Sequence, residues 1–178
     1  VFYSLVNLAQ NGDNIAYSNK IYGGSQTLLV HVLKRFGIEG RVFDIDNLSS
    51  LEKIIDDKTK AIFFESLSNP QIAIADVETI TNIAKKHKIV TICDNTVATP
   101  ILFRPFDFGV DVSVHSLTKY INGHGSGLGG AVIEREGLNE LIKDNSRYPA
   151  FNTPDESYHG LIYANLPLPI FSIRILIE

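Results

Sequence analysis

Short runs of apolar, often β-branched residues alternate along this chain with segments whose apolar residues recur every three or four positions. The runs that predict strands are 41–45, 61–64, 89–93, 110–114 and 131–133, and the helical patterns are 25–36, 49–55 and 76–88. This alternation is typical of βαβ units built around a mainly parallel sheet. We therefore predict an α/β protein with a mostly parallel sheet and helices on both of its faces.

Local signals mark the ends of the predicted helices. Gly37 follows the first helical pattern, and glycine readily takes the left-handed conformation that ends a helix. Ser49 and Glu52 have the spacing of a capping box, and Asp76 precedes the third helical pattern as an N-cap residue would. The uninterrupted apolar run 61–64 predicts a strand that is buried on both faces of the sheet.

Composition and charge narrow the possible functions. The chain has 178 residues, 44% of them hydrophobic, and its 16 Lys and Arg against 20 Asp and Glu give a formal charge of −4. A chain of this length can bury one substantial core, and it lacks the positive charge that phosphate neutralisation requires. No apolar run reaches the roughly 18 residues of a membrane span, and no signal segment opens the chain. We expect a cytoplasmic protein without a nucleic-acid or membrane partner.

The sequence gives little support for a disulfide or a metal site. Cys93 is the only cysteine, which excludes an internal disulfide and a multi-cysteine zinc site. It lies in an apolar run, where a buried and unreactive thiol is expected. The five histidines show no metal-ligand spacing, so we expect no metal.

Polar residues follow three of the predicted strands. Glu65 and Asn69 follow the second strand, Asp94 the third, and Ser116 to Lys119 the fourth. The carboxyl ends of parallel strands lie at one edge of a sheet, where ligands of open α/β folds bind. Taken singly, each of these residues more often forms a turn, caps a helix or carries a solvated charge. Their occurrence together at one edge of the sheet is what indicates a site.

These side chains match the needs of one cofactor. A lysine in a dry pocket beside cationic or hydroxyl groups can lose its proton more easily and form a Schiff base with an aldehyde, which is the chemistry available to Lys119. The hydroxyls of Ser116 and Thr118 can hold a phosphate. A carboxylate such as Asp94 can keep a pyridine nitrogen protonated, as an electron-sink cofactor requires. Together they describe a pyridoxal phosphate (PLP) site.

A glycine-rich segment offers a competing interpretation. Residues 125–130 formally satisfy the G-x-G-x-x-G pattern of dinucleotide-binding proteins. That pattern should follow a strand and open a helix, whereas these glycines lead into the apolar run 131–133. We interpret the segment as a tight, close-packed turn.

Several segments resemble, in order and spacing, the trans-sulfuration family of PLP-dependent enzymes of cysteine and methionine metabolism. The segments that carry the resemblance are 22–24, 65–70, 94–100 and 115–120, including Asp-Asn-Thr at 94–96 and Ser-Leu-Thr-Lys at 116–119. Residues 123–125 and 148–160 are most similar to those of O-acetylhomoserine sulfhydrylases. The resemblance implies the large cofactor-binding domain of the aspartate-aminotransferase-like (fold type I) enzymes.

The resemblance covers only the central portion of a family chain. Both ends of the sequence stop inside apolar patterns and no methionine occurs, which also predicts a piece of a longer protein. We expect residues 1–160 to form the PLP-binding large domain, incomplete at its N-terminus. Residues 161–178 would begin the connection toward a C-terminal domain that this chain lacks.

The resemblance also implies roles for the residues that hold the cofactor. Lys119 would carry PLP as a Schiff base and move protons between substrate carbons. Asp94 would pair with the pyridinium nitrogen. Ser116 and Thr118 would help to hold the phosphate.

Further residues are implied at the cofactor ring. Tyr22 would stack on the ring and assist proton transfer or departure of the leaving group. Tyr22 and Lys119 are the two expected catalytic residues. Asn69 would hydrogen-bond near the ring hydroxyl, with Glu65 behind it. Arg174 does not match the family's substrate-carboxylate arginine, which lies in the C-terminal domain, and the upstream glycine loop that binds the phosphate is also missing.

The implied reaction is γ-replacement on O-acetyl-L-homoserine by sulfide or a thiol, which gives homocysteine or methionine and acetate. Elimination, as in cystathionine or methionine lyases, and the cystathionine γ-synthase reaction stay open, as does a non-catalytic α/β binding module. Family members form homotetramers built from dimers, whose neighbouring subunits complete each site. We therefore expect these 178 residues alone to bind PLP weakly and not to turn over.

Overall fold

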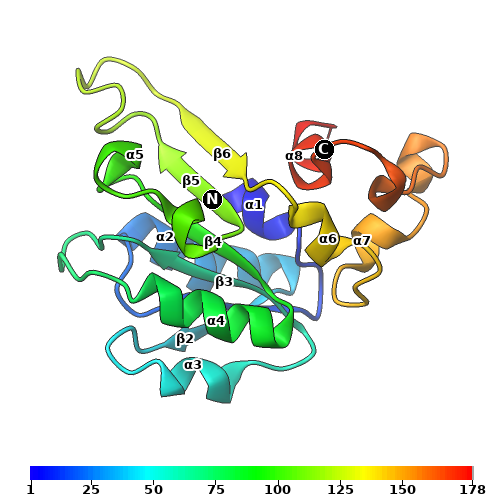
Figure 1. Ribbon diagram of the computed structural model, residues 1–178, viewed down its shortest axis with the longest axis horizontal. Coiled ribbons are helices and arrows are strands. Elements are labelled where there is room, and N and C mark those ends of the chain that lie inside the picture. Colours follow the sequence, from blue (N-terminus) through cyan, green and yellow to red (C-terminus); the bar gives the residue numbers. More distant parts are fainter. Residues whose placement is uncertain (178) are drawn as a thin grey trace.

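A six-stranded sheet of order β2-β1-β3-β4-β5-β6 runs through the molecule (Figure 1). The structure, a computed structural model, describes residues 1–177. The strands are β1 (Asn14–Ser18), β2 (Glu39–Phe43), β3 (Thr59–Glu65), β4 (Val90–Asp94), β5 (Val112–Ser116) and β6 (Gly130–Glu134). Neighbouring strands are parallel except β5 and β6, which are antiparallel. The predicted mostly parallel sheet is confirmed.

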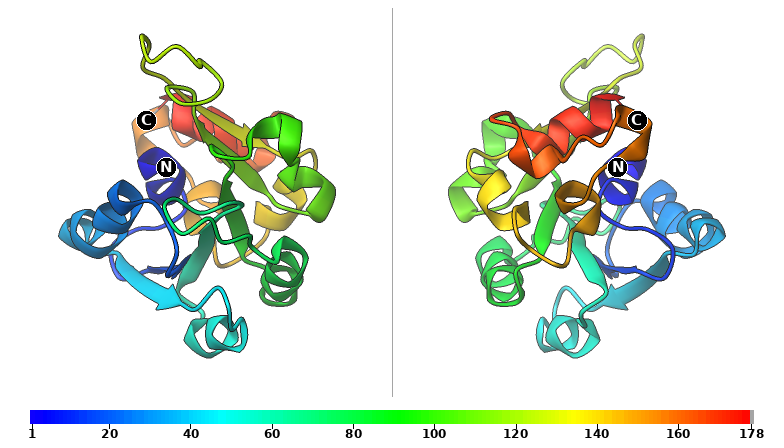
Figure 2. Two further views of the ribbon diagram at one scale, coloured as in Figure 1. Left: turned by 90° about the vertical axis from the view of Figure 1, so that its left-hand side faces the viewer. Right: turned by 90° about the vertical axis from the view of Figure 1, so that its right-hand side faces the viewer.

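Helices cover both faces of this sheet (Figures 1 and 2). On one face, α3 (Ser49–Ile54) and α4 (Val77–His87) contribute to a core cluster with β3 and β4. The other face is covered by α1 (Phe2–Val6), by the helical stretch that begins with α2 (Gly23–Thr27), and by α6 (Leu138–Ile142), α7 (Pro149–Asn152) and α8 (Ile170–Ile177). Short helices also occur at α5 (Thr99–Leu102) and, as 3-10 turns, at Pro105–Phe108, Glu156–Tyr158 and Tyr163–Asn165. The prediction of helices on both faces is confirmed.

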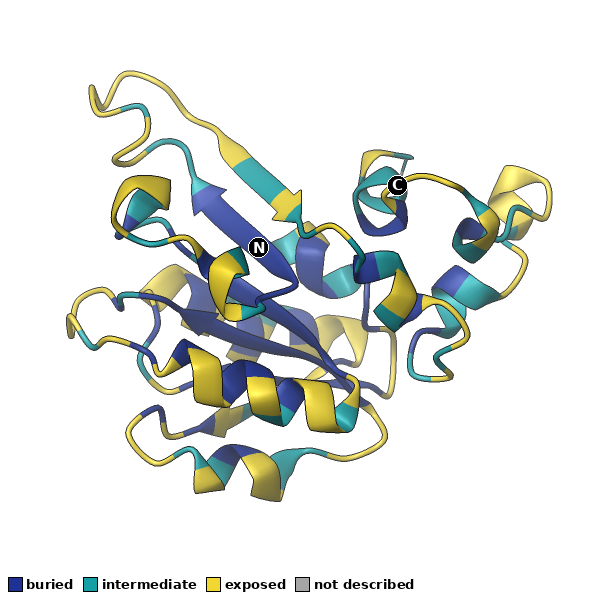
Figure 3. Cartoon of the chain, in the orientation of Figure 1, coloured by how far each residue is buried: buried dark blue, intermediate teal, exposed yellow. Residues whose placement is uncertain are grey.

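The strand β3 is buried along its whole length (Figure 3). Ala61 and Phe63 belong to the core cluster on one face, and Ile62 and Phe64 to the cluster on the other. A strand covered on both faces has no side that must be polar. This explains why its central residues, 61–64, are uniformly apolar.

The strand β1, second from one edge of the sheet, is an element that the apolar pattern does not reveal. It lies between β2 and β3 and is entirely buried, yet it begins with Asn14 and ends with Ser18. The side chain of Asn14 donates a hydrogen bond to Asp56 at 2.9 Å and accepts one from the hydroxyl of Thr59 at 2.7 Å. Because these partners satisfy the buried amide, a polar residue is tolerated at this strand end.

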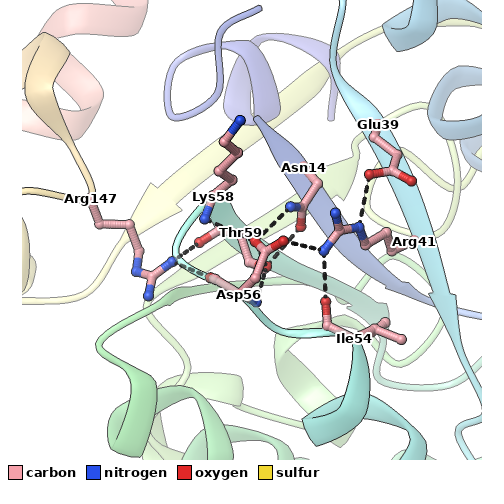
Figure 4. A network of polar contacts seen from close by, with 8 residues as sticks. All are labelled: Asn14, Glu39, Arg41, Ile54, Asp56, Lys58, Thr59 and Arg147. Carbon is pink, nitrogen blue, oxygen red and sulfur yellow. Dashed lines mark hydrogen bonds and ion pairs between the residues drawn. The ribbon is translucent and has the colours of Figure 1, made fainter. Parts of the chain in front are cut away.

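Asp56 joins several segments near the amino ends of β1 and β3 (Figure 4). Its carboxylate accepts hydrogen bonds from Asn14 and from Arg41 on β2, and Arg147 donates to its main-chain carbonyl at 2.8 Å. Burial raises the pKa of Asp56, but the hydrogen bonds from Asn14, Arg41 and a main-chain N–H outweigh it and hold that pKa well below its usual range. The polar network therefore lies away from the carboxyl edge, and its role is to join segments of the fold.

The predicted capping box at the start of α3 is wrong. The hydroxyl of Ser49 donates to the side chain of Asn47 at 2.7 Å, and no side chain caps the helix. Glu52 instead forms an ion pair with Lys86 on α4 at 2.7 Å. The carboxylate is drawn to a charge on a neighbouring helix, which the local spacing of Ser49 and Glu52 does not reveal.

Two other predicted helix ends are confirmed. Asp76 accepts a hydrogen bond from the N–H of Thr79 at 3.1 Å and caps α4. The helical stretch that begins with α2 continues through a π-helical turn (Leu28–Val32) and a 3-10 turn (Leu33–Phe36). It ends at Gly37, whose φ of 73° is left-handed.

The glycine-rich segment between β5 and β6 is an exposed loop, and the predicted close-packed turn is wrong. Residues 123–130 are all exposed, and a Cβ placed on Gly125 would meet no atom within 4 Å. Figure 1 shows the loop extending away from the sheet. Since β6 is an edge strand, its connection runs through solvent, and Gly123 and Gly125 supply positive φ angles rather than close approach.

Residues 161–177 pack onto the same core as the start of the chain. Phe171 is fully buried, and its carbonyl accepts a hydrogen bond from the side chain of Asn7 at 3.0 Å. Arg174 donates to the carbonyl of Asn7 and lies over the ring of Phe151, 5.2 Å from its centroid. Arg174 therefore joins the two ends of the described chain. Of the expected connection 161–178, Glu178 lies outside the described residues.

Candidate active site

A cavity of about 570 Å³ lies at the carboxyl ends of β3, β4 and β5. The loops that follow these strands meet at one end of the sheet, on the left of Figure 1. The strand register explains their meeting, because Glu65 on β3 is paired with Asp94 on β4, and Asp94 with Val114 on β5. The cavity is lined by all six predicted site residues, Tyr22, Asn69, Asp94, Ser116, Thr118 and Lys119, and also by Glu65 and Thr96.

Asp94 is oriented by the residue two positions further along the chain. Its Oδ1 accepts hydrogen bonds from the N–H of Thr96 at 3.0 Å and from the Thr96 hydroxyl at 2.5 Å. Its Oδ2 has no hydrogen-bond donor among residues 1–177. One carboxylate oxygen is thus fixed, and the other is available to a ligand.

Thr96 is the site residue that the sequence analysis does not assign. Its hydroxyl oxygen also accepts the N–H of Ser116 at 2.8 Å, which connects the ends of β4 and β5. The available signal is the Asp-x-Thr spacing directly after a buried strand, since a side-chain oxygen often bonds the main chain two residues on. That spacing predicts the local turn, but the bond to Ser116 depends on strand pairing.

The two predicted phosphate-binding hydroxyls differ in their surroundings. The hydroxyl of Ser116 has no partner within the part of the chain that the structure describes. The hydroxyl of Thr118 donates to the carbonyl of Gly129 at 3.3 Å and accepts the N–H of Gly129 at 3.0 Å. Thr118 therefore holds the glycine-rich loop as well as lining the cavity.

Lys119 lies at the mouth of the cavity. Its main chain is fixed, since its N–H donates to the carbonyl of Ser116 at 3.1 Å and its carbonyl accepts the N–H of Gly123 at 2.8 Å. The side chain is exposed and forms no ion pair with any residue from 1 to 177. The dry surroundings expected for this amine are therefore not provided by the described residues.

Tyr22 and Asn69 enter the cavity from two different loops. The N–H of Tyr22 donates to Oε1 of Glu65 at 2.7 Å, and the N–H of Asn69 donates to Oε2 at 3.1 Å. Glu65 is only 6% exposed, while the Tyr22 side chain is about half exposed. Burial raises the pKa of Glu65 to about 7, and the nearby charge of Asp94 adds to this effect while the two N–H bonds oppose it.

The available groups fit pyridoxal phosphate. An aldehyde needs an amine, a pyridinium nitrogen needs a carboxylate oxygen, and a phosphate needs hydroxyl or N–H donors. Lys119 supplies the amine, Oδ2 of Asp94 the carboxylate oxygen and Ser116 an unpartnered hydroxyl, all around one cavity. Tyr22 adds an exposed aromatic face on which a flat ring can stack.

Neither a metal site nor a membrane span is found in this part of the chain. Between residues 1 and 177, His, Cys, Asp and Glu side chains nowhere gather in threes as metal ligands would. Over the same range, every helix is too short or too polar to cross a membrane.

Comparison with known sequences gives a consistent group of relatives. The family model for Cys/Met metabolism PLP-dependent enzymes matches residues 1–159. O-acetyl-L-homoserine sulfhydrylase of Corynebacterium glutamicum is 39% identical over 175 residues, and homocysteine/cysteine synthase of Saccharomyces cerevisiae is 40% identical over 157 residues. These alignments cover 97% and 88% of this chain but only 40% and 35% of the relatives. The chain thus spans about two fifths of the length of these curated relatives.

Solved structures agree with the sequence comparison. A Campylobacter jejuni protein described as an O-acetylhomoserine (thiol)-lyase, which contains pyridoxyl-lysine monophosphate, is 71% identical with a TM-score of 0.99. The match covers 99% of this chain and 44% of that one. Cystathionine γ-lyase from Lactobacillus plantarum is 37% identical with a TM-score of 0.72 over 78% of this chain and 36% of its own. These likenesses confirm the predicted fold type I architecture.

Proposed function

Because the chain belongs to the Cys/Met metabolism family of PLP-dependent enzymes, we propose that the whole protein catalyses γ-replacement on O-acetyl-L-homoserine. Sulfide or a thiol would replace the acetoxy group at the γ-carbon, which leaves as acetate, giving homocysteine with sulfide or methionine with methanethiol. The observation that carries this proposal is the single cavity that unites Lys119, Asp94, Ser116 and Tyr22. The 71% identity to a protein described as an O-acetylhomoserine (thiol)-lyase supports the choice of substrate.

The bound cofactor supplies an electron sink for negative charge on substrate carbons. Lys119 would provide the amine that holds the cofactor, and its Nζ would accept and return protons at the substrate carbons. Oδ2 of Asp94 would accept a hydrogen bond from the protonated ring nitrogen, while Thr96 keeps Oδ1 engaged. A carboxylate oriented in this way favours the protonated ring.

Four residues would orient the cofactor and substrate. Ser116 and Thr118 would donate hydroxyl hydrogen bonds to the phosphate, with Thr118 turning away from Gly129 to do so. Tyr22 would stack on the ring, and its hydroxyl would serve in proton transfer or leaving-group departure. Asn69 would hydrogen-bond the ring hydroxyl through its side-chain amide.

The same residues would also serve an elimination reaction. L-methionine gamma-lyase of Pseudomonas putida is 37% identical over 140 residues, and it keeps this second candidate open. Product analysis separates the two reactions. With O-acetyl-L-homoserine and sulfide, replacement yields homocysteine and acetate, whereas elimination yields ammonia and a keto acid even without sulfide.

The assembly and setting form part of the proposal. We propose a cytoplasmic homotetramer in which another copy covers the cavity region, and in which residues 1–160 form the PLP-binding large domain. Large apolar side chains near the cavity loops support a covering partner, since Ile101, Leu102 and Leu128 are 90%, 79% and 94% exposed. Light scattering of the full-length protein tests the oligomer, and a monomer at micromolar concentration would contradict it.

The decisive experiment is an absorption spectrum of the full-length protein with PLP, before and after borohydride reduction. We expect a reducible chromophore in the wild type and in the control Lys143→Ala, which removes another exposed lysine. We expect no reducible chromophore in Lys119→Ala. Loss of signal in Lys143→Ala, or its survival in Lys119→Ala, would contradict the assignment. The isolated 178 residues should bind PLP more weakly than the full chain and show no turnover.

A further inference from the structure

The carboxylate of Glu65 is shared between two loops that are distant in sequence. Oε1 accepts the N–H of Tyr22, 43 residues earlier, at 2.7 Å, and Oε2 accepts the N–H of Asn69 at 3.1 Å. Tyr22 follows β1 by a short loop and Asn69 follows β3, and both line the cavity. One side chain thus fixes the main chain at two of the cavity's residues.

Burial of a carboxylate at this position is costly for the fold. Glu65 is 6% exposed, and its register partner on β4 is another carboxylate, Asp94. A buried charge beside a like charge is destabilising unless donors compensate it. The described contacts of the Glu65 carboxylate are two main-chain N–H groups, those of Tyr22 and Asn69. Residues that are unfavourable for folding are expected mainly at functional sites. Glu65, whose carboxylate is satisfied only by the main chain of two cavity loops, fits this expectation.

We propose that Glu65 is a positioning residue, which holds Tyr22 and Asn69 in place so that the ring of one and the amide of the other meet the same ligand. This inference rests on the proposed function for the identity of that ligand. Glu65 acts through the two main chains and does not touch the cofactor. The arrangement resembles a clamp with two arms, because each carboxylate oxygen holds one loop.

The variant Glu65→Gln tests the clamp with the smallest change in shape. A glutamine has one carbonyl oxygen, so it can accept only one of the two N–H groups and places an NH₂ donor against the other. One loop is then released. Glu65→Asp keeps the charge, but its side chain is shorter by one methylene and cannot hold both loops. The control is Glu52→Gln, a surface glutamate paired with Lys86, which loses the same charge far from the cavity.

The first measurement is hydrogen–deuterium exchange of the cofactor-free, full-length protein. We expect exchange in peptides containing Tyr22 or Asn69 to accelerate about tenfold or more in Glu65→Gln, in at least one of the two loops. Peptides containing the N–H of Thr96 should exchange as in the wild type, and Glu52→Gln should match the wild type throughout. Unchanged exchange in both loops would overturn the proposal.

The second measurement is steady-state kinetics of the same variants. We expect kcat to fall about tenfold or more in Glu65→Gln while PLP stays bound, and to fall in Glu65→Asp as well, because neither side chain can hold both loops. Faster exchange with unaltered kcat and KM would overturn the proposal, since the clamp would then be structural only. Slower turnover with unaltered exchange would also overturn it, because Glu65 would then act directly on the reacting atoms.

A third measurement covers the case in which neither variant folds. In the wild type, the N–H groups of Tyr22 and Asn69 favour the ionised form of Glu65, so its protonation should loosen both loops while Glu65 itself stays buried. Protection of the Tyr22 and Asn69 peptides, corrected for intrinsic exchange, should therefore rise together between pH 6 and pH 8. Global stability should change in the opposite direction, because complete unfolding exposes Glu65 to water. The titratable groups facing Glu65 are Asp94 and the Cys93 thiol on β4, and Lys119 lines the same cavity. The proposal would be overturned if protection of the two peptides did not change over this pH range, or if it changed at different pH values in the two peptides. Exchange needs no cofactor, so a wild type that forms no chromophore refutes the proposed function and leaves this test intact.

Discussion

The hydroxyl of Thr96 donates a hydrogen bond of 2.5 Å to Oδ1 of Asp94, and this contact fixes the carboxylate at the floor of the cavity. The same hydroxyl oxygen accepts the N–H of Ser116 at 2.8 Å. Three of the cavity's residues, from the ends of two adjacent strands, are therefore joined through one hydroxyl. The geometry leaves the other oxygen of Asp94 for a ligand.

Replacing Thr96 should loosen this connection. In Thr96→Val, Asp94 loses a donor and the N–H of Ser116 loses its acceptor, so we expect PLP affinity to fall about tenfold or more. The free energy of unfolding should fall by about 1–3 kcal/mol, because a partly buried N–H is left unpaired. Thr96→Ser keeps the hydroxyl and should stay near the wild type in both respects. PLP titration and urea unfolding measure the two effects, and equal PLP affinity of Thr96→Val and wild type would contradict the role.

Gly24 leaves room for the ring of Tyr22. A Cβ on Gly24 would lie 2.7 Å from Cε1 of Tyr22, whereas a Cβ on Gly23 would meet nothing within 4 Å. Gly24→Ala should therefore displace the tyrosine ring and lower kcat by about tenfold, while Gly23→Ala should not. Both sites lie in α2, where alanine favours the helix by about 1 kcal/mol over glycine, so neither variant should unfold more readily. Kinetics and thermal unfolding of both variants check this, and equal kcat values would refute it.

The raised pKa of Glu65 gives stability a defined pH dependence. Burial raises this pKa to about 7 from an ordinary value of 4.5, so the folded state binds the proton more tightly than the unfolded state. The contribution of Glu65 to stability is then fully present below pH 4.5 and is lost as the pH rises through 7. Urea unfolding of wild type and Glu65→Gln should show this decline in the wild type only. An identical pH slope in both proteins would mean that Glu65 does not cause it.

Asp56 should contribute in the opposite direction. Hydrogen bonds from Asn14 and Arg41 outweigh the effect of burial and hold its pKa below the usual range (Figure 4). Its stabilisation is therefore present at neutral pH and is lost as the pH falls below about 4. Asp56→Asn should lower the free energy of unfolding at pH 7, and the difference from the wild type should shrink at pH 3. The neighbouring Asp57→Asn removes the same charge from an exposed carboxylate and is the control for net charge.

The sequence by itself determines the layered α/β architecture and the main members of the site. Runs rich in apolar residues identify the buried strands, and Asp94, Ser116 and Lys119 follow two of these runs within five residues. Because parallel strands end at one edge of a sheet, residues at those ends converge whatever the detailed packing. This physical rule is why Asn69, Asp94 and the segment from Ser116 to Lys119 could be predicted to meet before their distances were known. Tyr22 follows the unpredicted strand β1, and only the family resemblance assigned it to the site.

Other features depend on contacts that only the tertiary structure decides. The sequence pattern does not predict strand β1, because its polar end residue Asn14 is satisfied by a hydrogen bond from Thr59, 45 positions away. The bond from Glu65 to Tyr22 spans 43 positions in the same way. A local pattern predicts a turn or a strand, since those depend on neighbours in sequence. Which oxygen satisfies which buried donor depends on strand order and register, and these are set when the whole sheet assembles.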